Sequence, residues 1–204
     1  LEKGYIHYHL SHTYHLLGKK ELSQSHIDNA LIHLKKSRNK KWYNIAMMTK
    51  AMTLVENGFV KEGIETADKI LLSASINDKQ YRAQLLVNIS KIYIDTFEIT
   101  KAIKVCKEAY LIFEELQIVE GMINSLTNLV SSLGQDDNYI DDAENYGLKL
   151  LELSRKESLI TVQVIVLNSL TSISRQKKKY FEAKQYGNEV IKLCQHLKMK
   201  DKVI

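Results

Sequence analysis

Apolar residues recur at helical spacing between Arg82 and Ile118, in two stripes separated by a short break. The first stripe consists of Leu85, Leu86, Ile89, Ile92 and Tyr93. The second consists of Ile99, Ala102, Ile103, Cys106, Ala109, Tyr110 and Phe113. Members of a stripe lie three or four residues apart, so each stripe covers one face of an α-helix. Because the break spans only positions 96–98, the stretch predicts two helices joined by a tight turn.

The same helical hairpin recurs along the whole chain. A small residue opens each second helix at nearly equal intervals, at Ser23, Gly63, Ala102, Ala143 and Ala183. These positions predict five hairpins, at about 3–37, 41–75, 79–117, 120–156 and 159–198. Stacked hairpins bury the apolar face that each would expose alone. We therefore expect an all-α fold, a right-handed superhelical solenoid with a period of about 40 residues. We expect it to form one domain over residues 1–204 and to be a fragment of a longer protein.

The first helices of the last three hairpins carry a polar face opposite the apolar stripe. In the third hairpin this face includes Gln84, Asn88 and Lys91, and a constant repeat step leads to Asn124 and Asn128, then to Asn168 and Arg175. An asparagine side chain can accept from a backbone N–H and donate to a backbone C=O. We interpret the row Asn88, Asn128 and Asn168, called the asparagine ladder below, as a set of contacts to the backbone of an extended peptide. The alternative is an exposed helix face that carries asparagine only for solubility.

The same step back along the chain leads to Met48 and then Tyr8. Methionine adapts to irregular apolar surfaces and tyrosine offers a large contact area. We expect these two residues to contact an apolar side chain of the ligand, with ordinary packing between repeats as the alternative.

Six of the seven histidines precede residue 34. His12 and His15 lie one helical turn apart and could share a metal ion. No cysteine or carboxylate stands at a suitable spacing to complete the site. We therefore predict no metal and no cofactor. That the histidines make one end of the peptide-binding face sensitive to pH is left as an open interpretation.

Composition narrows the classes of protein that remain. The chain has no proline and 8 glycines in 204 residues, so nothing interrupts long helices and a β-sandwich lacks its turn residues. The net charge of +5 comes from basic residues near both ends, while the middle is acidic, so we predict no nucleic-acid interface within this chain. The run 177–179 of three lysines is more simply a solvated loop than a phosphate contact.

The cellular location follows from what the sequence lacks. No apolar run is long enough to span a membrane, and no secretory leader opens the chain, so we expect a cytoplasmic protein. Cys106 and Cys194 lie in separate hairpins, and we expect both to be small buried residues without a disulfide. No phosphate-binding loop, nucleophile motif or metalloprotease motif is present, which predicts a protein that is not an enzyme.

These features resemble a known group of receptors. The small residues Ser90, Ala102 and Ala109 resemble the spacing of the tetratricopeptide repeat (TPR). The repeat length, the first helices LLVNISKIY and LTNLVSSLG, and the asparagine ladder resemble the C-terminal repeat domain of the Rap, NprR and PlcR peptide-pheromone receptors of Gram-positive bacteria. The resemblance implies that Asn88, Asn128 and Asn168 hold the backbone of a short reimported peptide.

Two functions are compatible with the sequence. The first is a peptide-sensing domain of a transcriptional or signalling regulator, as in quorum sensing. The second is a scaffold that binds a protein segment constitutively. The expected partner is a short peptide or an extended protein segment; a homodimer is left open, and DNA would be contacted only through a domain absent from this chain.

Overall fold

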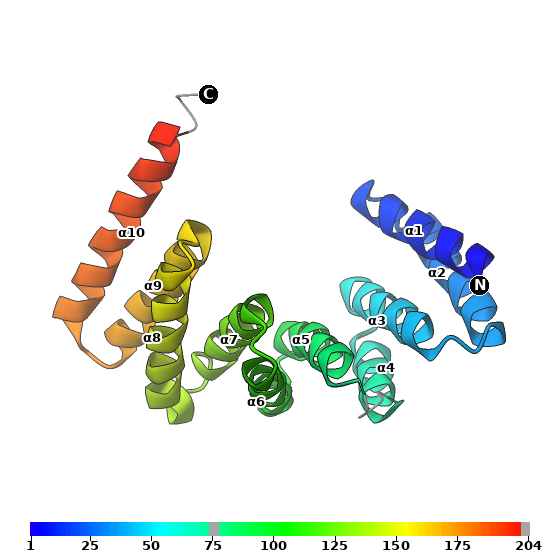
Figure 1. The fold of residues 1–204 in the computed structure, drawn as a ribbon, viewed down its shortest axis with the longest axis horizontal. Coiled ribbons are helices and arrows are strands. Elements are labelled where there is room, and N and C mark those ends of the chain that lie inside the picture. The colour runs from blue at the N-terminus through cyan, green and yellow to red at the C-terminus, as the bar shows by residue number, and fades with distance from the viewer. Residues whose placement is uncertain (74–77, 201–204) are drawn as a thin grey trace. The chain divides into compact units, whose positions relative to one another are not determined.

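The computed structural model describes residues 1–73 and 78–200, and the described residues form ten α-helices and one short 3-10 helix (Figure 1). The first helices of the successive pairs are α1 (Glu2–Leu16), α3 (Lys40–Glu56), α5 (Lys79–Asp95), α7 (Val119–Leu133) and α9 (Ile160–Gln176). The second helices are α2 (Lys20–Lys36), α4 (Val60–Ser73), α6 (Ile99–Glu115), α8 (Ile140–Lys156) and α10 (Tyr180–Lys200). The predicted all-α repeat fold is confirmed.

The contacts within the chain divide it into two compact units, Leu1–Phe97 and Glu98–Ile204, which are described separately. In the first unit, Ile27, Ala30 and Leu34 of α2 form a buried cluster with Ala46 of α3. Helix α5 is tied to this unit by two tyrosines. The Tyr81 hydroxyl donates to the Lys41 carbonyl over 3.0 Å, and the Tyr93 hydroxyl donates to the Asp68 carboxylate over 2.5 Å.

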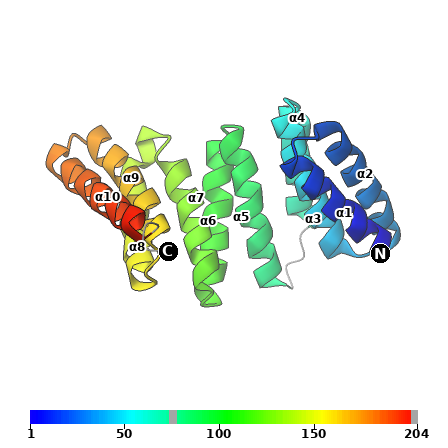
Figure 2. The ribbon, with the colours of Figure 1, turned by 90° about the horizontal axis from the view of Figure 1, so that it is seen from above.

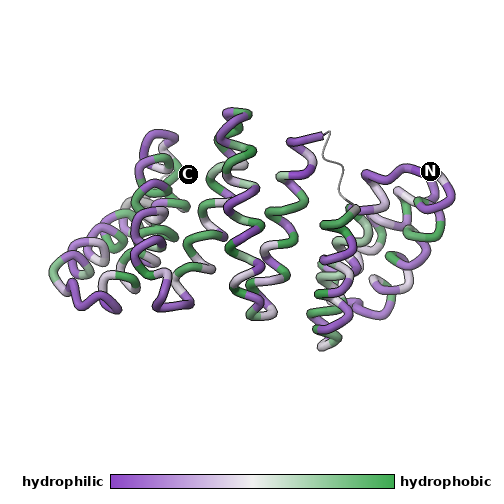
Figure 3. Tube along the Cα trace, turned by 90° about the horizontal axis from the view of Figure 1, so that it is seen from below, coloured by the Kyte–Doolittle hydropathy of each residue, from purple (hydrophilic) through white to green (hydrophobic). Residues whose placement is uncertain are grey.

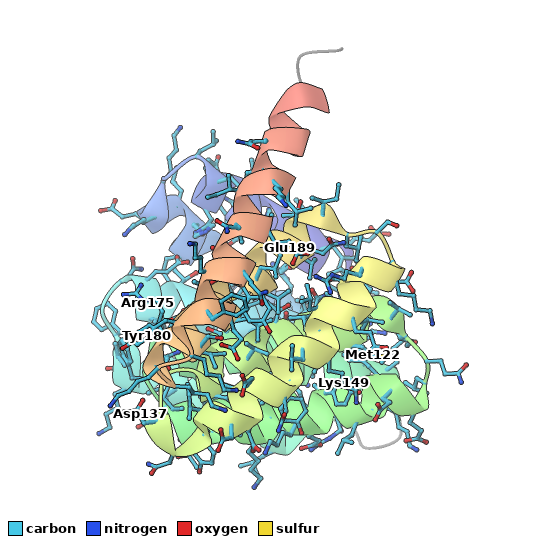
Figure 4. All side chains as sticks on the ribbon, turned by 90° about the vertical axis from the view of Figure 1, so that its left-hand side faces the viewer. Met122, Asp137, Lys149, Arg175, Tyr180 and Glu189 are labelled. Carbon is cyan, nitrogen blue, oxygen red and sulfur yellow. The ribbon has the colours of Figure 1, made fainter. Side chains whose placement is uncertain are left out.

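In the second unit, each helix from α6 to α10 contributes apolar residues to the core or packs apolar residues against it (Figure 3). Ion pairs join successive second helices across the surface. Lys107 pairs with Asp142 at 3.4 Å, Lys149 with Glu114 at 3.1 Å, and Arg155 with Glu189 at 2.6 Å. Figure 4 shows Lys149 on α8 and Glu189 on α10.

The lysine run after α9 is part of this unit's ion-pair network. Lys177 contacts the carboxylates of Asp141 and Glu144, which raise the pKa of its ammonium group. Lys179 also pairs with Glu144, at 2.7 Å. Two of the three lysines therefore join the α9–α10 connection to α8, and the prediction of a merely solvated loop is wrong for them.

The helix ends use left-handed backbone conformations, most of them at residues other than glycine. Gly18 and Gly58 have φ of 69° and 87°, a conformation that glycine adopts without steric cost. The other left-handed residues are Arg38, Phe97, Gln117, Ser158 and Lys178. After Gly18, Gly58, Gln117, Ser158 and Lys178, the backbone N–H of the next residue donates to a carbonyl five residues earlier, as from Leu159 to Ser154, which is the Schellman arrangement.

Helix starts agree with the sequence only in part. Asn77 and Asp78 are the candidate cap residues that the sequence offers before α5. Asp78 accepts from the Tyr81 N–H at 3.0 Å, while Asn77 lies outside the described residues. The 3-10 helix Asp137–Tyr139 was not predicted. It follows Asp136, whose carboxylate accepts from the Asn138 N–H at 2.9 Å and so favours a local turn over a direct start of α8.

The small positions that define the repeat are buried in all five hairpins, at Ser23, Gly63, Ala102, Ala143 and Ala183. The prediction for the cysteines is half right, since Cys106 is buried but Cys194 on α10 is partly exposed. In the part of the chain that the structure describes, no helix combines the length and apolar character needed to cross a bilayer.

Candidate functional site

The first unit contains a cavity of about 270 Å³ lined by its three first helices. Helix α1 contributes Tyr8, His12 and His15, helix α3 contributes Ile45, Met48, Thr49, Met52, Thr53 and Glu56, and helix α5 contributes Leu85 and Asn88. The structure therefore brings together Tyr8, Met48 and Asn88, three residues that the sequence analysis selected. We call this space the first-unit cavity.

The first-unit cavity has an apolar floor and a polar rim. Met48 and Leu85 are almost fully buried, and Met52 is partly exposed beside them. The hydroxyls of Thr49 and Thr53 donate to backbone carbonyls of α3, so they present mainly their methyl groups and one acceptor. The ring nitrogen Nδ1 of His15 lies 3.5 Å from a carboxylate oxygen of Glu56. The polar groups that line the cavity thus include an amide, two imidazoles and one carboxylate.

The repeat length is not constant along the first helices. The residues that precede these helices are Asn39, Asp78, Ile118 and Leu159, and each interval in this series is one residue longer than the interval before it. The position equivalent to Asn88 is therefore Thr49 in α3, and the position equivalent to Asn128 is Ser169 in α9. The constant step used in the sequence analysis had selected Met48 and Asn168, one residue away in each case.

The second unit holds its own smaller cavity, of about 200 Å³, between α7 and α9. Its lining consists of Val130, Ser131, Gly134, Gln135, Ser169, Ser172 and Ile173. Asn128 is half-buried on α7, whereas Asn124 and Asn168 are exposed. Arg175 is exposed near the end of α9, close to the α9–α10 connection that leads to Tyr180 (Figure 4).

The remaining predicted residues, Gln84 and Lys91, are exposed on α5 and do not line the first-unit cavity. The cavity residues that escaped the prediction include Thr49, Thr53 and Glu56 in the first unit and Ser169 in the second. Thr49 could have been found from the interval between Gly63 and Ala102, which is one residue shorter than the interval before it. The interval between Ala143 and Ala183 leads from Asn128 to Asn168, so it gives no sign of Ser169. Glu56 carries no such signal.

The histidines that the structure brings together differ from the pair named in the sequence analysis. The Nδ1 atoms of His7 on α1 and His26 on α2 are 2.8 Å apart, so one ring donates a hydrogen bond to the other. The ring of His33 stacks on the ring of His7, with the two ring centroids 5.7 Å apart. Burial, and then the neighbouring imidazoles and Lys3, lower the pKa of His7. Among the described residues, no group of three side chains is arranged to hold a metal ion.

The chain was compared with known proteins by sequence and by structure. No protein-family model and no curated protein matches the sequence. Among solved structures, the chain is similar to the nearly identical TPR-like repeats of a kinesin light chain from Podospora anserina, with a TM-score of 0.82, 12% identity, and coverage of 98% of this chain and 99% of that one. The fold is a TPR-like helical repeat.

Two further solved structures are longer than this chain. Aspartyl phosphate phosphatase F from Bacillus subtilis matches with a TM-score of 0.76, 12% identity, and coverage of 96% of this chain and 51% of that one. A Rap protein complexed with competence and sporulation factor matches with a TM-score of 0.68, 13% identity, and coverage of 97% and 65%. This chain therefore spans about half to two thirds of those proteins, and the TPR-like repeat resembles that of a Rap protein.

Proposed function

We propose that this chain is a binding domain for an extended peptide, which it holds on its first helices. The observation that carries the proposal is the first-unit cavity, in which an apolar floor lies beside the amide of Asn88. Side-chain pockets next to backbone-binding groups are how proteins recognise extended peptides.

The apolar floor would take one large apolar side chain of the peptide. Met48, Met52 and Leu85 offer a surface that adapts to side chains of different shape. Tyr8 closes one side, where its ring packs against Trp42 with centroids 5.6 Å apart. This part of the site would decide which peptide is preferred.

The amide groups would hold the peptide backbone. Asn88 does so at the first-unit cavity, and Asn128 occupies the equivalent position in the second unit. Further contacts on the exposed faces of the same helices would come from Asn168, Asn124, Gln84, Lys91 and Arg175. Thr49 and Ser169 would also contact the peptide, because they occupy positions equivalent to Asn88 and Asn128 in their repeats. Backbone contacts of this kind bind a peptide with little regard to its sequence.

The comparison with a Rap protein complexed with competence and sporulation factor supports a peptide ligand, because a similar helical repeat occurs in that complex. In the fuller form of the proposal, the chain is the cytoplasmic sensor part of a signalling or transcriptional regulator. DNA contact would then require a domain outside this chain. The proposal assigns binding and no reaction to these residues.

A second candidate function is a constitutive protein-interaction scaffold. It is favoured by the likeness to kinesin light chain repeats, which extends over nearly the full length of both chains. A scaffold would bind a folded or long protein segment and would not need a pocket for a short peptide.

The two candidates can be separated by selecting ligands from a library of short linear peptides and measuring their affinity by calorimetry. We expect Asn88→Ala and Asn128→Ala each to remove up to two hydrogen bonds, at a cost of about 1 to 3 kcal/mol or roughly 5- to 150-fold in affinity. Thermal stability should change little, because neither side chain lies in the core. Comparing Asn168→Ala with Ser169→Ala shows which residue of α9 contacts the peptide.

Asn145→Ala is the matched control, since Asn145 is an exposed asparagine on the second helix α8. Its affinity for the selected peptide should equal that of the parent protein. A library that yields no binding peptide, or an Asn88→Ala variant that binds as tightly as the parent, contradicts the peptide site and favours the scaffold.

A further inference from the structure

The cavity between α7 and α9, called the second-unit cavity below, is the same feature of the repeat as the first-unit cavity. Both lie between neighbouring first helices, and Figure 2 shows α7 and α9 within their unit. Three positions, counted from the residue that precedes each first helix, occur in both linings. They are held by Thr49 and Ser169, by Met52, Ser131 and Ser172, and by Glu56 and Gln135. Equivalent positions therefore line the two cavities with different side chains.

The second-unit cavity is neutral and rich in hydroxyl groups. Ser131 and Ser172 stand where the first unit has the thioether of Met52. Gln135 stands where the first unit has Glu56, so a neutral amide takes the place of a carboxylate. The lining that the structure describes for the second-unit cavity contains no ionisable side chain.

Two of these hydroxyls are available to a ligand. The hydroxyl of Ser169 donates to the Ile165 carbonyl over 3.3 Å, and the amide of Gln135 donates to the Ser131 carbonyl over 3.1 Å. The exposed side chains of Ser131 and Ser172 have no hydrogen-bond partner within the described residues. Each hydroxyl can donate one hydrogen bond and accept others.

The lining favours one class of side chain over the alternatives. A charged side chain would lose water without meeting an opposite charge in the lining, and an apolar one would cover the hydroxyls without bonding to them. An uncharged polar side chain can bond to the hydroxyls while its carbon atoms contact Val130 and Ile173, which are buried. The volume of about 200 Å³ suits a single side chain, because sites for small molecules usually begin at about 300 Å³.

We propose that the second-unit cavity takes an uncharged polar side chain of the bound peptide, that of serine, threonine, asparagine or glutamine. This inference rests on the proposed peptide-binding function and adds the class of residue that the second unit selects. Because the floor of the first-unit cavity is apolar, the two cavities select different side chains.

Calorimetry with single-residue analogues of the selected peptide tests the assignment. We expect one peptide position at which threonine binds roughly 3- to 10-fold more tightly than valine, which has the same shape but lacks the hydroxyl. Aspartate and lysine at that position should bind about 10-fold more weakly than threonine, because the lining offers neither of them a counter-charge.

The combined variant Ser131→Ala with Ser172→Ala removes both available hydroxyls from exposed positions, so the fold should be kept. We expect its ratio of affinities for the threonine and valine peptides to fall to about 1, as in a double-mutant cycle. Its preference for a large apolar residue elsewhere in the peptide should stay as in the parent. Thr100→Ala is the control, because Thr100 is exposed on the second helix α6 and lies outside the cavity.

The outcomes separate this inference from the proposed function. If Asn128→Ala weakens binding but no peptide position prefers threonine to valine, the peptide site stands and the assignment of the second-unit cavity is overturned. A preference that survives the loss of both serines overturns the assignment in the same way. A library that yields no binding peptide overturns the proposed function and this inference with it.

Discussion

Helices α6 and α7 approach closely at Gly121. A Cβ atom there would lie 2.3 to 2.5 Å from three ring atoms of Phe113, and this buried ring has no room to move aside. We expect Gly121→Ala to lower the free energy of unfolding by about 1 to 3 kcal/mol, as overpacking does. Thermal and urea unfolding measure the change.

Gly187→Ala is the matched control for that substitution. Gly187 also lies within a helix, but open space surrounds its Cα atom, so alanine should stabilise α10 by up to about 1 kcal/mol through helix propensity alone. Equal melting temperatures for Gly121→Ala and the parent would contradict the packing of α6 against α7 described above.

His7 makes the first unit sensitive to acid. Its pKa is lowered in the folded protein by burial and by His26, His33 and Lys3, so the unfolded chain binds a proton at this residue more readily. The stability linked to the neutral form of His7 is therefore present above the ordinary histidine pKa near 6.5 and is lost as the pH falls below it. We expect the melting temperature to fall between pH 7.5 and about 5, and to fall less in His7→Gln.

His12→Gln serves as the control, because His12 is exposed and lies outside that cluster. It should follow the parent across the whole pH range. Parallel curves for the parent and His7→Gln would show that the imidazole pair does not set the acid sensitivity.

At the scale of the helix, the connections between elements carry strain that substitution can relieve. Ser158 adopts a φ of 56° after α8, a conformation that costs residues with a Cβ about 1 to 2 kcal/mol. We expect Ser158→Gly to raise the free energy of unfolding by about 1 kcal/mol, measured by denaturant unfolding. Gly18→Ala should lower the free energy of unfolding by a similar amount, and Ser158→Ala should leave it nearly unchanged. A loss of stability in Ser158→Gly would be inconsistent with the left-handed turn.

The helices themselves could be predicted from the sequence because the apolar stripes and small residues repeat at helical spacing. The left-handed turns that lack glycine in the described part of the chain could not, because side chains such as Arg38 and Gln117 give no sign of that conformation in the sequence. Hydrogen bonds to the preceding helix impose it, and these exist only once the helix has formed.

At the scale of the whole chain, the repeat fold was predictable but the site was predictable only in part. Tyr8 and Asn88 were selected because hydrophobic and polar positions keep their order on the first helices, while the constant step selected Met48, which lines the same cavity, in place of Thr49. Thr49 and Ser169 were missed because the repeats differ from one another by a residue in length. Glu56 was missed because its place beside His15 depends on how α1 and α3 pack, which the spacing within one helix does not reveal.

Within each unit, most of the contacts between elements join helices that are consecutive in the chain. Little chain entropy has to be lost before such contacts form, so each hairpin can assemble early and its neighbour can add to it. We therefore expect each unit to fold within milliseconds, with the amide protons of its middle helix, α3 in the first unit and α8 in the second, exchanging last.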